Sequence, residues 1–164
     1  MNEYLPVPQP EEVSQRERDD AMGSYLMMFA SWAVGLPLPM INVVASIIYY
    51  FANRNKGPYV RFHALQSLYS QVLIGLVNSA SIVWIIIMVI NETFDAKYFI
   101  PFIIMAVIAN ILYITFSIIA AVYARKGRFF YFFFFGRLSY MQAYSATNPL
   151  NTGEEASYTN RPPA

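Results

Sequence analysis

The stretch PYVRFHALQSLYSQVLIGLVNSASIVWIIIMVI occupies residues 58–90 and is almost free of charged side chains after its first turn. Gly57 precedes it as a helix breaker, and Pro58 suits the first turn of a helix. At about 1.5 Å per residue, a helix of this length exceeds the ~30 Å hydrocarbon core of a bilayer. The stretch therefore predicts a transmembrane helix that crosses with some tilt.

The composition of the whole chain agrees with lipid as its solvent. Of 164 residues, 57% are hydrophobic and only 13% are charged, whereas a soluble domain carries roughly 25% charged residues. The apolar residues form long runs, and the charges gather in both tails and in two short loops. This pattern predicts an integral membrane protein.

Several functional classes are excluded by residue type. The chain has no cysteine and one histidine, so disulfides, thiolate metal sites and histidine-cluster metal sites are excluded. Outside the apolar runs it has no basic patch with interleaved aromatic residues, which disfavours nucleic acid as a partner. No nucleophile, base and orienting group can be assembled from its residues. We expect no cofactor, no metal and no enzymatic activity.

Two further apolar regions flank the opening stretch. Residues 98–124 are long enough to span the bilayer. Residues 21–52 are interrupted by GLPLP at residues 35–39, and two prolines this close cannot lie inside a straight helix. The halves, residues 21–34 and 38–52, are each only about 20 Å long as helices. The region is therefore one broken span or a hairpin of two short helices.

The ends of the chain look different from the membrane domain, which we place at residues 21–140. Residues 1–20 are rich in proline and charge and predict a solvated, disordered acidic tail, with a short surface helix at residues 13–20 as the alternative. Residues 141–164 have few aliphatic side chains and predict a disordered C-terminal tail.

The distribution of basic residues predicts the topology. Two segments are basic and are expected in the cytoplasm together with the C-terminus: residues 54–61 and the segment with Arg125, Lys126, Arg128 and Arg137. The loop NETFDAK at residues 91–97 is expected on the opposite side. Residues 128–140 include seven consecutive aromatic residues, which cover only about 10 Å as a helix. We interpret this segment as an interfacial anchor, with a packed re-entrant segment as the alternative.

Polar residues in the opening stretch recur at spacings of three, four and seven, which places them near one helix face. With two asparagines from the neighbouring regions, they predict a polar interhelical seam of Asn42, Ser70, Gln71, Asn78 and Asn110. A hydrogen-bonded seam is favoured over a wet path or substrate contact, because no carboxylate lies within the stripe. Next to Arg61 and the headgroups, His63 is expected to act as an anchor or cap.

Four motifs carry a family resemblance. They are ER-x-x-AM at residues 17–22, GLPLPMINVV at residues 35–44, PYVRFHALQSLYSQ at residues 58–71, and ARKG at residues 124–127. Across roughly residues 16–138 the chain resembles the bacterial Tic-twenty-like membrane proteins, the domain of unknown function forty-eight seventy group. The FFYFFFF run departs from that pattern.

The resemblance implies a bundle of about four helices in the bacterial cytoplasmic membrane, with both termini in the cytoplasm. It favours the hairpin for residues 21–52 and implies no enzymatic activity. The motif residues that would also form a cytoplasmic anchor are Arg61, Phe62, His63, Gln66 and Ser67.

Two functions remain open. The first is a non-enzymatic accessory or scaffold subunit that associates with the bilayer and with other membrane subunits or with itself. The alternative is a channel or protein-translocation element with a polar path along residues 58–90.

Overall fold

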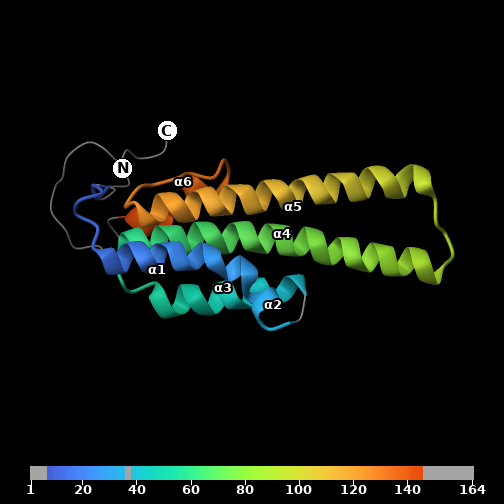
Figure 1. Ribbon diagram of the computed structural model, residues 1–164, viewed down its shortest axis with the longest axis horizontal. Coiled ribbons are helices and arrows are strands. Elements are labelled where there is room, and N and C mark those ends of the chain that lie inside the picture. The colour runs from blue at the N-terminus through green and yellow to red at the C-terminus, as the bar shows by residue number, and fades with distance from the viewer. Residues whose placement is uncertain (1–6, 36–37, 146–164) are drawn as a thin grey trace.

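A computed structural model of the chain describes residues 7–35 and 38–145. Every element of these residues is a helix (Figure 1). In chain order the elements are α1 (Gln15–Leu26), the 3₁₀ turn η1 (Met27–Phe29), α2 (Ala30–Ala33), α3 (Pro39–Asn53), α4 (Pro58–Ile90), α5 (Ala96–Arg125) and α6 (Phe135–Tyr144). The predicted all-α class is confirmed, but the predicted number of four helices is not.

Local sequence signals explain where the main helices begin. Ser14 and Glu17 form a reciprocal capping box at the start of α1. Gly57, with φ of 128°, precedes Pro58 at the first turn of α4. At α5, the side chain of Asp95 accepts a 2.9 Å hydrogen bond from the backbone N–H of Lys97.

The segment from α1 to α3 folds back on itself as an antiparallel hairpin. At its turn, the backbone N–H of Ser31 donates to Oδ1 of Asn42 over 2.8 Å. Near its other end, the hydroxyl of Tyr49 donates to the carbonyl of Asp20 over 2.8 Å. Both halves of the hairpin are therefore short, and the start of α1 lies at the same end as the end of α3 (Figure 1). Leu36 and Pro37 of the GLPLP sequence lie outside the described residues.

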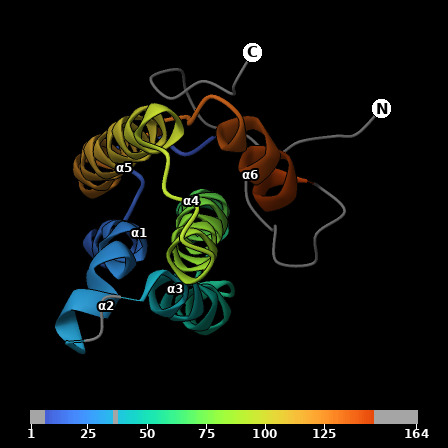
Figure 2. The same ribbon diagram turned by 90° about the vertical axis from the view of Figure 1, so that its right-hand side faces the viewer.

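Helix α4 is the centre of the bundle. In the end-on view of Figure 2, α1, α3, α5 and α6 surround it, and all four pack against it. From Tyr59 to Gln71, most of its side chains are buried. The far halves of α4 and α5 extend beyond the other described elements as a two-helix hairpin (Figure 1).

This extended hairpin exposes apolar side chains on every side. Val89 and Ile90 are 70% and 73% exposed, and most of the large aliphatic side chains of α5 are about half exposed. A soluble protein does not present so large an apolar surface to water. Helices α4 and α5 are also long and apolar enough to cross a bilayer. With 33 residues, α4 is about 50 Å long. The fold is that of a helical membrane protein.

The N-terminal segment differs from the prediction of a solvated tail through residue 20. Residues 7–20 belong to the described fold, and α1 begins at Gln15. The side chains of Val7 and Val13 are buried in the same core cluster as Ala120 and Ala124 of α5. Burial of these two valines, together with the Ser14 capping box, stabilises the segment against the bundle.

The aromatic segment, predicted to be an interfacial anchor at residues 128–140, is in part packed against the bundle. After α5 the chain turns at Gly127, runs without helix through residues 128–134, and continues as α6 against α4. Phe129 is buried, whereas Phe133 is 93% exposed. The segment therefore packs against the bundle at one end and is exposed at the other. The predicted C-terminal tail begins inside α6, and residues 146–164 lie outside the described residues.

Candidate functional site

A buried polar cluster lies where α1, α4 and the aromatic segment meet. The hydroxyl of Tyr25 is 3.0 Å from Nδ1 of His63 and accepts a 2.9 Å hydrogen bond from Nε2 of Gln66. Because the phenol oxygen accepts from Gln66, its proton is free to be donated to His63 Nδ1. The imidazole then carries its proton on Nε2, which is buried and has no hydrogen-bond partner among the described residues.

Gln66 also holds the aromatic segment in place. Its Nε2 donates to the carbonyl of Phe130 over 2.8 Å, and its Oε1 accepts from the backbone N–H of Phe132 over 3.1 Å. Non-helical backbone in an apolar layer must have its polar groups satisfied within the protein. One glutamine side chain thus satisfies two backbone groups of the segment.

Two further hydrogen bonds join the helices around this cluster. The hydroxyl of Ser67 donates to the carbonyl of Ser24 in α1 over 2.7 Å. The hydroxyl of Tyr59 donates to the carbonyl of Ala124, at the end of α5, over 2.7 Å. The aromatic ring of His63 packs against those of Tyr59 and Phe129, with centroid distances of 4.7 and 5.7 Å. The cluster therefore connects α1, α4, α5 and the aromatic segment.

These positions correct the predicted anchor at residues 61–67. Phe62, His63, Gln66 and Ser67 are all buried, so they do not contact headgroups. The prediction failed because nearness to a basic loop in sequence does not reveal which side of the helix the bundle covers. Arg61 is only partly buried, although its Nε and one terminal nitrogen are buried without a hydrogen-bond partner among the described residues.

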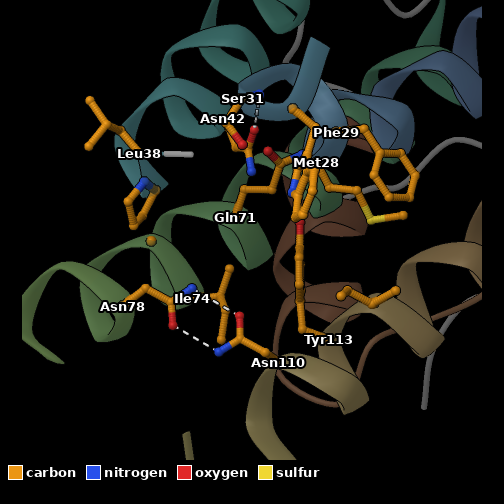
Figure 3. A pocket seen from close by; sticks show the side chains of 14 residues that line it. Met28, Phe29, Ser31, Leu38, Asn42, Gln71, Ile74, Asn78, Asn110 and Tyr113 are labelled. Carbon is orange, nitrogen blue, oxygen red and sulfur yellow. Dashed lines mark hydrogen bonds between the residues drawn. The ribbon is translucent and has the colours of Figure 1, made fainter. Parts of the chain in front are cut away.

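A second feature is a pocket about halfway along the molecule, which we call the polar pocket. It lies between the α2–α3 turn, α4 and α5 and has a volume of about 260 Å³ (Figure 3). Its polar lining residues are Ser31, Asn42, Gln71, Asn78, Asn110 and Tyr113. Four of the five predicted seam residues therefore lie around one pocket, and Ser70 does not.

The asparagines of the polar pocket are engaged in different ways. Asn78 and Asn110 exchange two hydrogen bonds of 2.9 and 2.8 Å between α4 and α5 (Figure 3). Asn42 accepts from the backbone of Ser31 and so closes the hairpin turn. The hydroxyl of Ser70 bonds to the carbonyl of Ser67 within its own helix. Of the predicted seam residues, Asn78 and Asn110 are the pair that joins the two long helices directly within the described residues.

Gln71 leaves one polar group of the pocket unsatisfied. Its Nε2 donates to Oγ of Ser67 over 3.0 Å, whereas its Oε1 is buried without a partner among the described residues. A polar cavity of this size with several hydrogen-bonding groups is suited to ordered water. The chemistry of the pocket therefore favours hydration over a dry seam.

Aromatic side chains close the space between α4 and α5 beyond the pocket. Trp84 of α4 packs against Phe102 and Phe99 of α5, with ring centroids 4.5 and 6.4 Å away. On the other side, the buried polar cluster fills the bundle around Tyr25 and Gln66. Within the described residues, the polar pocket is thus bounded along the bundle axis in both directions.

The predicted basic residues gather at the packed end of the molecule. Arg125 ends α5, Lys126 and Arg128 follow it, and Arg137 lies in α6. All four are exposed. The end of α5 lies at the same end of the molecule as the loop between α3 and α4, and the loop between α4 and α5 lies at the opposite end (Figure 1).

Sequence reasoning missed the tyrosines of both features. Tyr25 and Tyr59 complete the buried cluster, and Tyr113 lines the polar pocket. The available signal was a phenol within an apolar run, because a hydroxyl buried in lipid requires a hydrogen-bond partner. No sequence signal marked the backbone groups of Phe130 and Phe132 as partners of Gln66, because the turn after α5 is what brings them to it.

Fold and site together define a helical membrane protein with one densely packed end, a polar pocket at mid-length and an exposed apolar hairpin. The sequence profile of the magnetosome magnetite crystal formation protein family, MamF/MmsF, matches residues 19–139. The chain belongs to this family. No curated protein and no solved structure gives a significant match.

This match corrects the resemblance to the Tic-twenty-like proteins, because the profile that matches is that of the MamF/MmsF family. The motif used for the resemblance, PYVRFHALQSLYSQ, builds the packed half of α4. Such a motif describes how a small helical bundle packs and does not by itself identify a family.

Proposed function

We propose that the protein is a non-enzymatic accessory subunit of the magnetosome membrane, where it organises an assembly that supports magnetite crystal formation. The observation that carries this proposal is the family match across residues 19–139. The exposed far halves of α4 and α5 support it, since they offer apolar surface to lipid and to helices of other subunits or of a second copy.

The same proposal gives the membrane orientation. The basic residues after α3 and after α5 place the packed end in the cytoplasm by the positive-inside rule. The short loop with Glu92 and Asp95 then faces the interior of the magnetosome, and both described ends of the chain face the cytoplasm.

Genetic complementation tests the role in crystal formation. The gene is deleted from a magnetite-forming bacterium that carries it, and crystals are measured by electron microscopy. We expect crystals of altered size or shape, restored by the unaltered gene and by Gln71→Leu but not by Gln66→Leu, which breaks the contact with the aromatic segment. Unchanged crystals in the deletion strain would contradict the proposal.

Purification tests the accessory role. The protein is isolated in mild detergent at native expression and analysed by crosslinking and mass spectrometry. Stoichiometric membrane partners or a defined oligomer are expected. Recovery of a monomer alone would rule out an organising subunit.

The polar pocket supports a channel as the second candidate. A path through one chain would have to pass the contact between Trp84 and Phe102, so a channel would require an oligomer. Liposomes with the purified oligomer test it by solute flux. Flux above that of empty liposomes that disappears in Asn110→Leu would favour the channel, whereas flux equal to that of empty liposomes would exclude it.

A further inference from the structure

A basic cavity lies at the cytoplasmic end of α5. It has a volume of about 670 Å³ and is lined by Pro10, Glu11, Arg18, Arg125, Lys126 and Arg128. Four cationic side chains thus face one carboxylate. Such an excess of positive charge attracts an anionic group.

Three of these cations have no carboxylate partner in the described part of the chain. Arg125, Lys126 and Arg128 are exposed, and the ion pair found among the described residues joins Lys56 to Asp20 instead. Arg18 is fixed differently: its Nε donates to the carbonyl of Val13 over 3.0 Å, and a terminal nitrogen donates to the carbonyl of Pro10. The cavity therefore has one immobilised arginine and three cations that are free to turn toward a ligand.

An apolar groove adjoins the basic cavity at Arg125 and Lys126. Arg125 and Lys126 also line a second cavity of about 290 Å³, which runs between α1 and α5. Its remaining lining is apolar and consists of Met22, Leu26, Met28, Ile118, Ala121 and Val122. Between residues 118 and 126, α5 rises about 12 Å, so the groove extends from the charged end into the apolar layer.

Close packing of α1 against α5 explains why the groove has this position. Ala21 of α1 and Ala120 and Ala124 of α5 are completely buried, and small side chains let two helices approach closely. The larger side chains beside this contact form the two walls of the groove. Two of these wall residues are methionines, whose unbranched side chains adapt to irregular apolar ligands.

We propose that one anionic phospholipid of the cytoplasmic leaflet binds here, with its phosphate at Arg125, Lys126 and Arg128 and one acyl chain in the groove. Continuity of the basic cavity with an apolar groove favours a phospholipid over a free phosphate, which would leave the groove unused. The site is more specific than general anchoring by basic residues, because it requires this one interhelical groove. It does not depend on the role in crystal formation.

Lipid retention tests the charged half of the site. The full-length protein is titrated in detergent with long-chain phosphatidylglycerol or phosphatidylcholine and analysed by native mass spectrometry. We expect one bound phosphatidylglycerol and no retained phosphatidylcholine. The Arg125→Gln/Lys126→Gln protein should bind phosphatidylglycerol roughly 30-fold more weakly, at about fivefold per lost cation.

A matched control separates the site from general charge. The Arg54→Gln/Lys56→Gln protein loses the same charge at the same end of the molecule, outside the cavity, and should change the affinity less than twofold. Equal loss of affinity in both double variants would overturn the proposal. The unaltered protein provides a second measurement, since phosphatidylglycerol and not phosphatidylcholine should raise its apparent Tm.

Two substitutions on α5 test the acyl half. Val122→Trp fills the groove and should weaken phosphatidylglycerol binding about tenfold, whereas Val107→Trp lies outside it and should have no effect. The original side chains are 47% and 51% exposed, so both tryptophans are tolerated on the surface. Equal phosphatidylglycerol binding by the two variants would refute the proposal, because it would show an anion site without an acyl site. The same conclusion would follow if glycerol phosphate competed as effectively as the lipid.

Discussion

At the scale of single residues, Gly127 allows the chain to leave α5 and turn into the aromatic segment. Its φ is 72°, a backbone conformation that residues other than glycine rarely adopt. A Cβ at this position would also lie 2.9 Å from the carbonyl oxygen of Pro10. Gly127 therefore permits both the turn and the approach of the N-terminal segment.

We predict that Gly127→Ala lowers the free energy of unfolding by about 2 kcal/mol, from backbone strain and contact with Pro10 together. The apparent Tm in detergent measures it, at roughly 2–4 °C per kcal/mol. Gly35→Ala is the matched control, because Gly35 has φ of 71° with no described atom within 4 Å of an added Cβ. Equal loss in both variants would show that contact with Pro10 contributes nothing.

Gln66 and Gln71 allow a second comparison at this scale. Both are buried on α4, but only Gln66 bonds to Tyr25 and to the aromatic segment. Gln66→Leu leaves buried backbone groups unsatisfied, so we expect a loss of about 2–4 kcal/mol and faster trypsin cleavage after Arg128. Gln71→Leu should change stability by less than about 1 kcal/mol. A larger effect for Gln71→Leu than for Gln66→Leu would contradict this assignment.

At the scale of elements, the contact between α4 and α5 in the far half of the molecule depends on a few specific pairs. Asn78 and Asn110 form the reciprocal hydrogen bonds between the two helices, and Trp84 packs edge-to-face against Phe102 beyond them. Lipid provides little hydrophobic driving force between helices, so such pairs set their register.

A double-mutant cycle measures the asparagine pair. We predict a coupling free energy of about 0.5–1.5 kcal/mol between Asn78→Ala and Asn110→Ala, the range found for interhelical hydrogen bonds in membranes. The control cycle uses Ser81→Ala and Thr115→Ala, because both hydroxyls bond to carbonyls of their own helix. Coupling in the control cycle, or none in the asparagine cycle, would be inconsistent with the structure.

At the scale of the whole molecule, the packed end and the extended hairpin differ in packing and in surface. Helices α1, α3, α5 and α6 pack against α4, and the packed end also carries the basic cavity and the lipid groove. The other end exposes apolar side chains and closes with one short loop (Figure 1). This asymmetry is suited to a protein that is fixed at one membrane surface and contacts partners within the bilayer.

Topology can be tested by single cysteines, because the chain has none of its own. With an impermeant maleimide and sealed vesicles, Arg16→Cys and Asn55→Cys should be labelled from the same side and Thr93→Cys from the other. This result follows from the hairpin formed by α1 and α3. Labelling of Arg16→Cys together with Thr93→Cys would instead require α1 to α3 to cross the membrane as one span.

The sequence by itself determined the class of the protein and its two long helices. Long apolar runs need lipid, and backbone in lipid must be helical unless the protein buries it. The sequence also marked Asn42, Gln71, Asn78 and Asn110 as polar residues that need partners. These features are local, because they depend on composition and on helical periodicity alone.

Only the tertiary structure decided which partners those residues have. It turned His63 and Gln66 away from the headgroups and into a buried cluster, and it packed Val7 and Phe129 beneath α5. It also aligned Arg125 and Lys126 with a groove whose second wall, Met22, Leu26 and Met28, comes from about a hundred positions earlier in the chain. Contacts between distant segments depend on how the chain turns at Gly57 and Gly127, and helical periodicity carries no information about those turns.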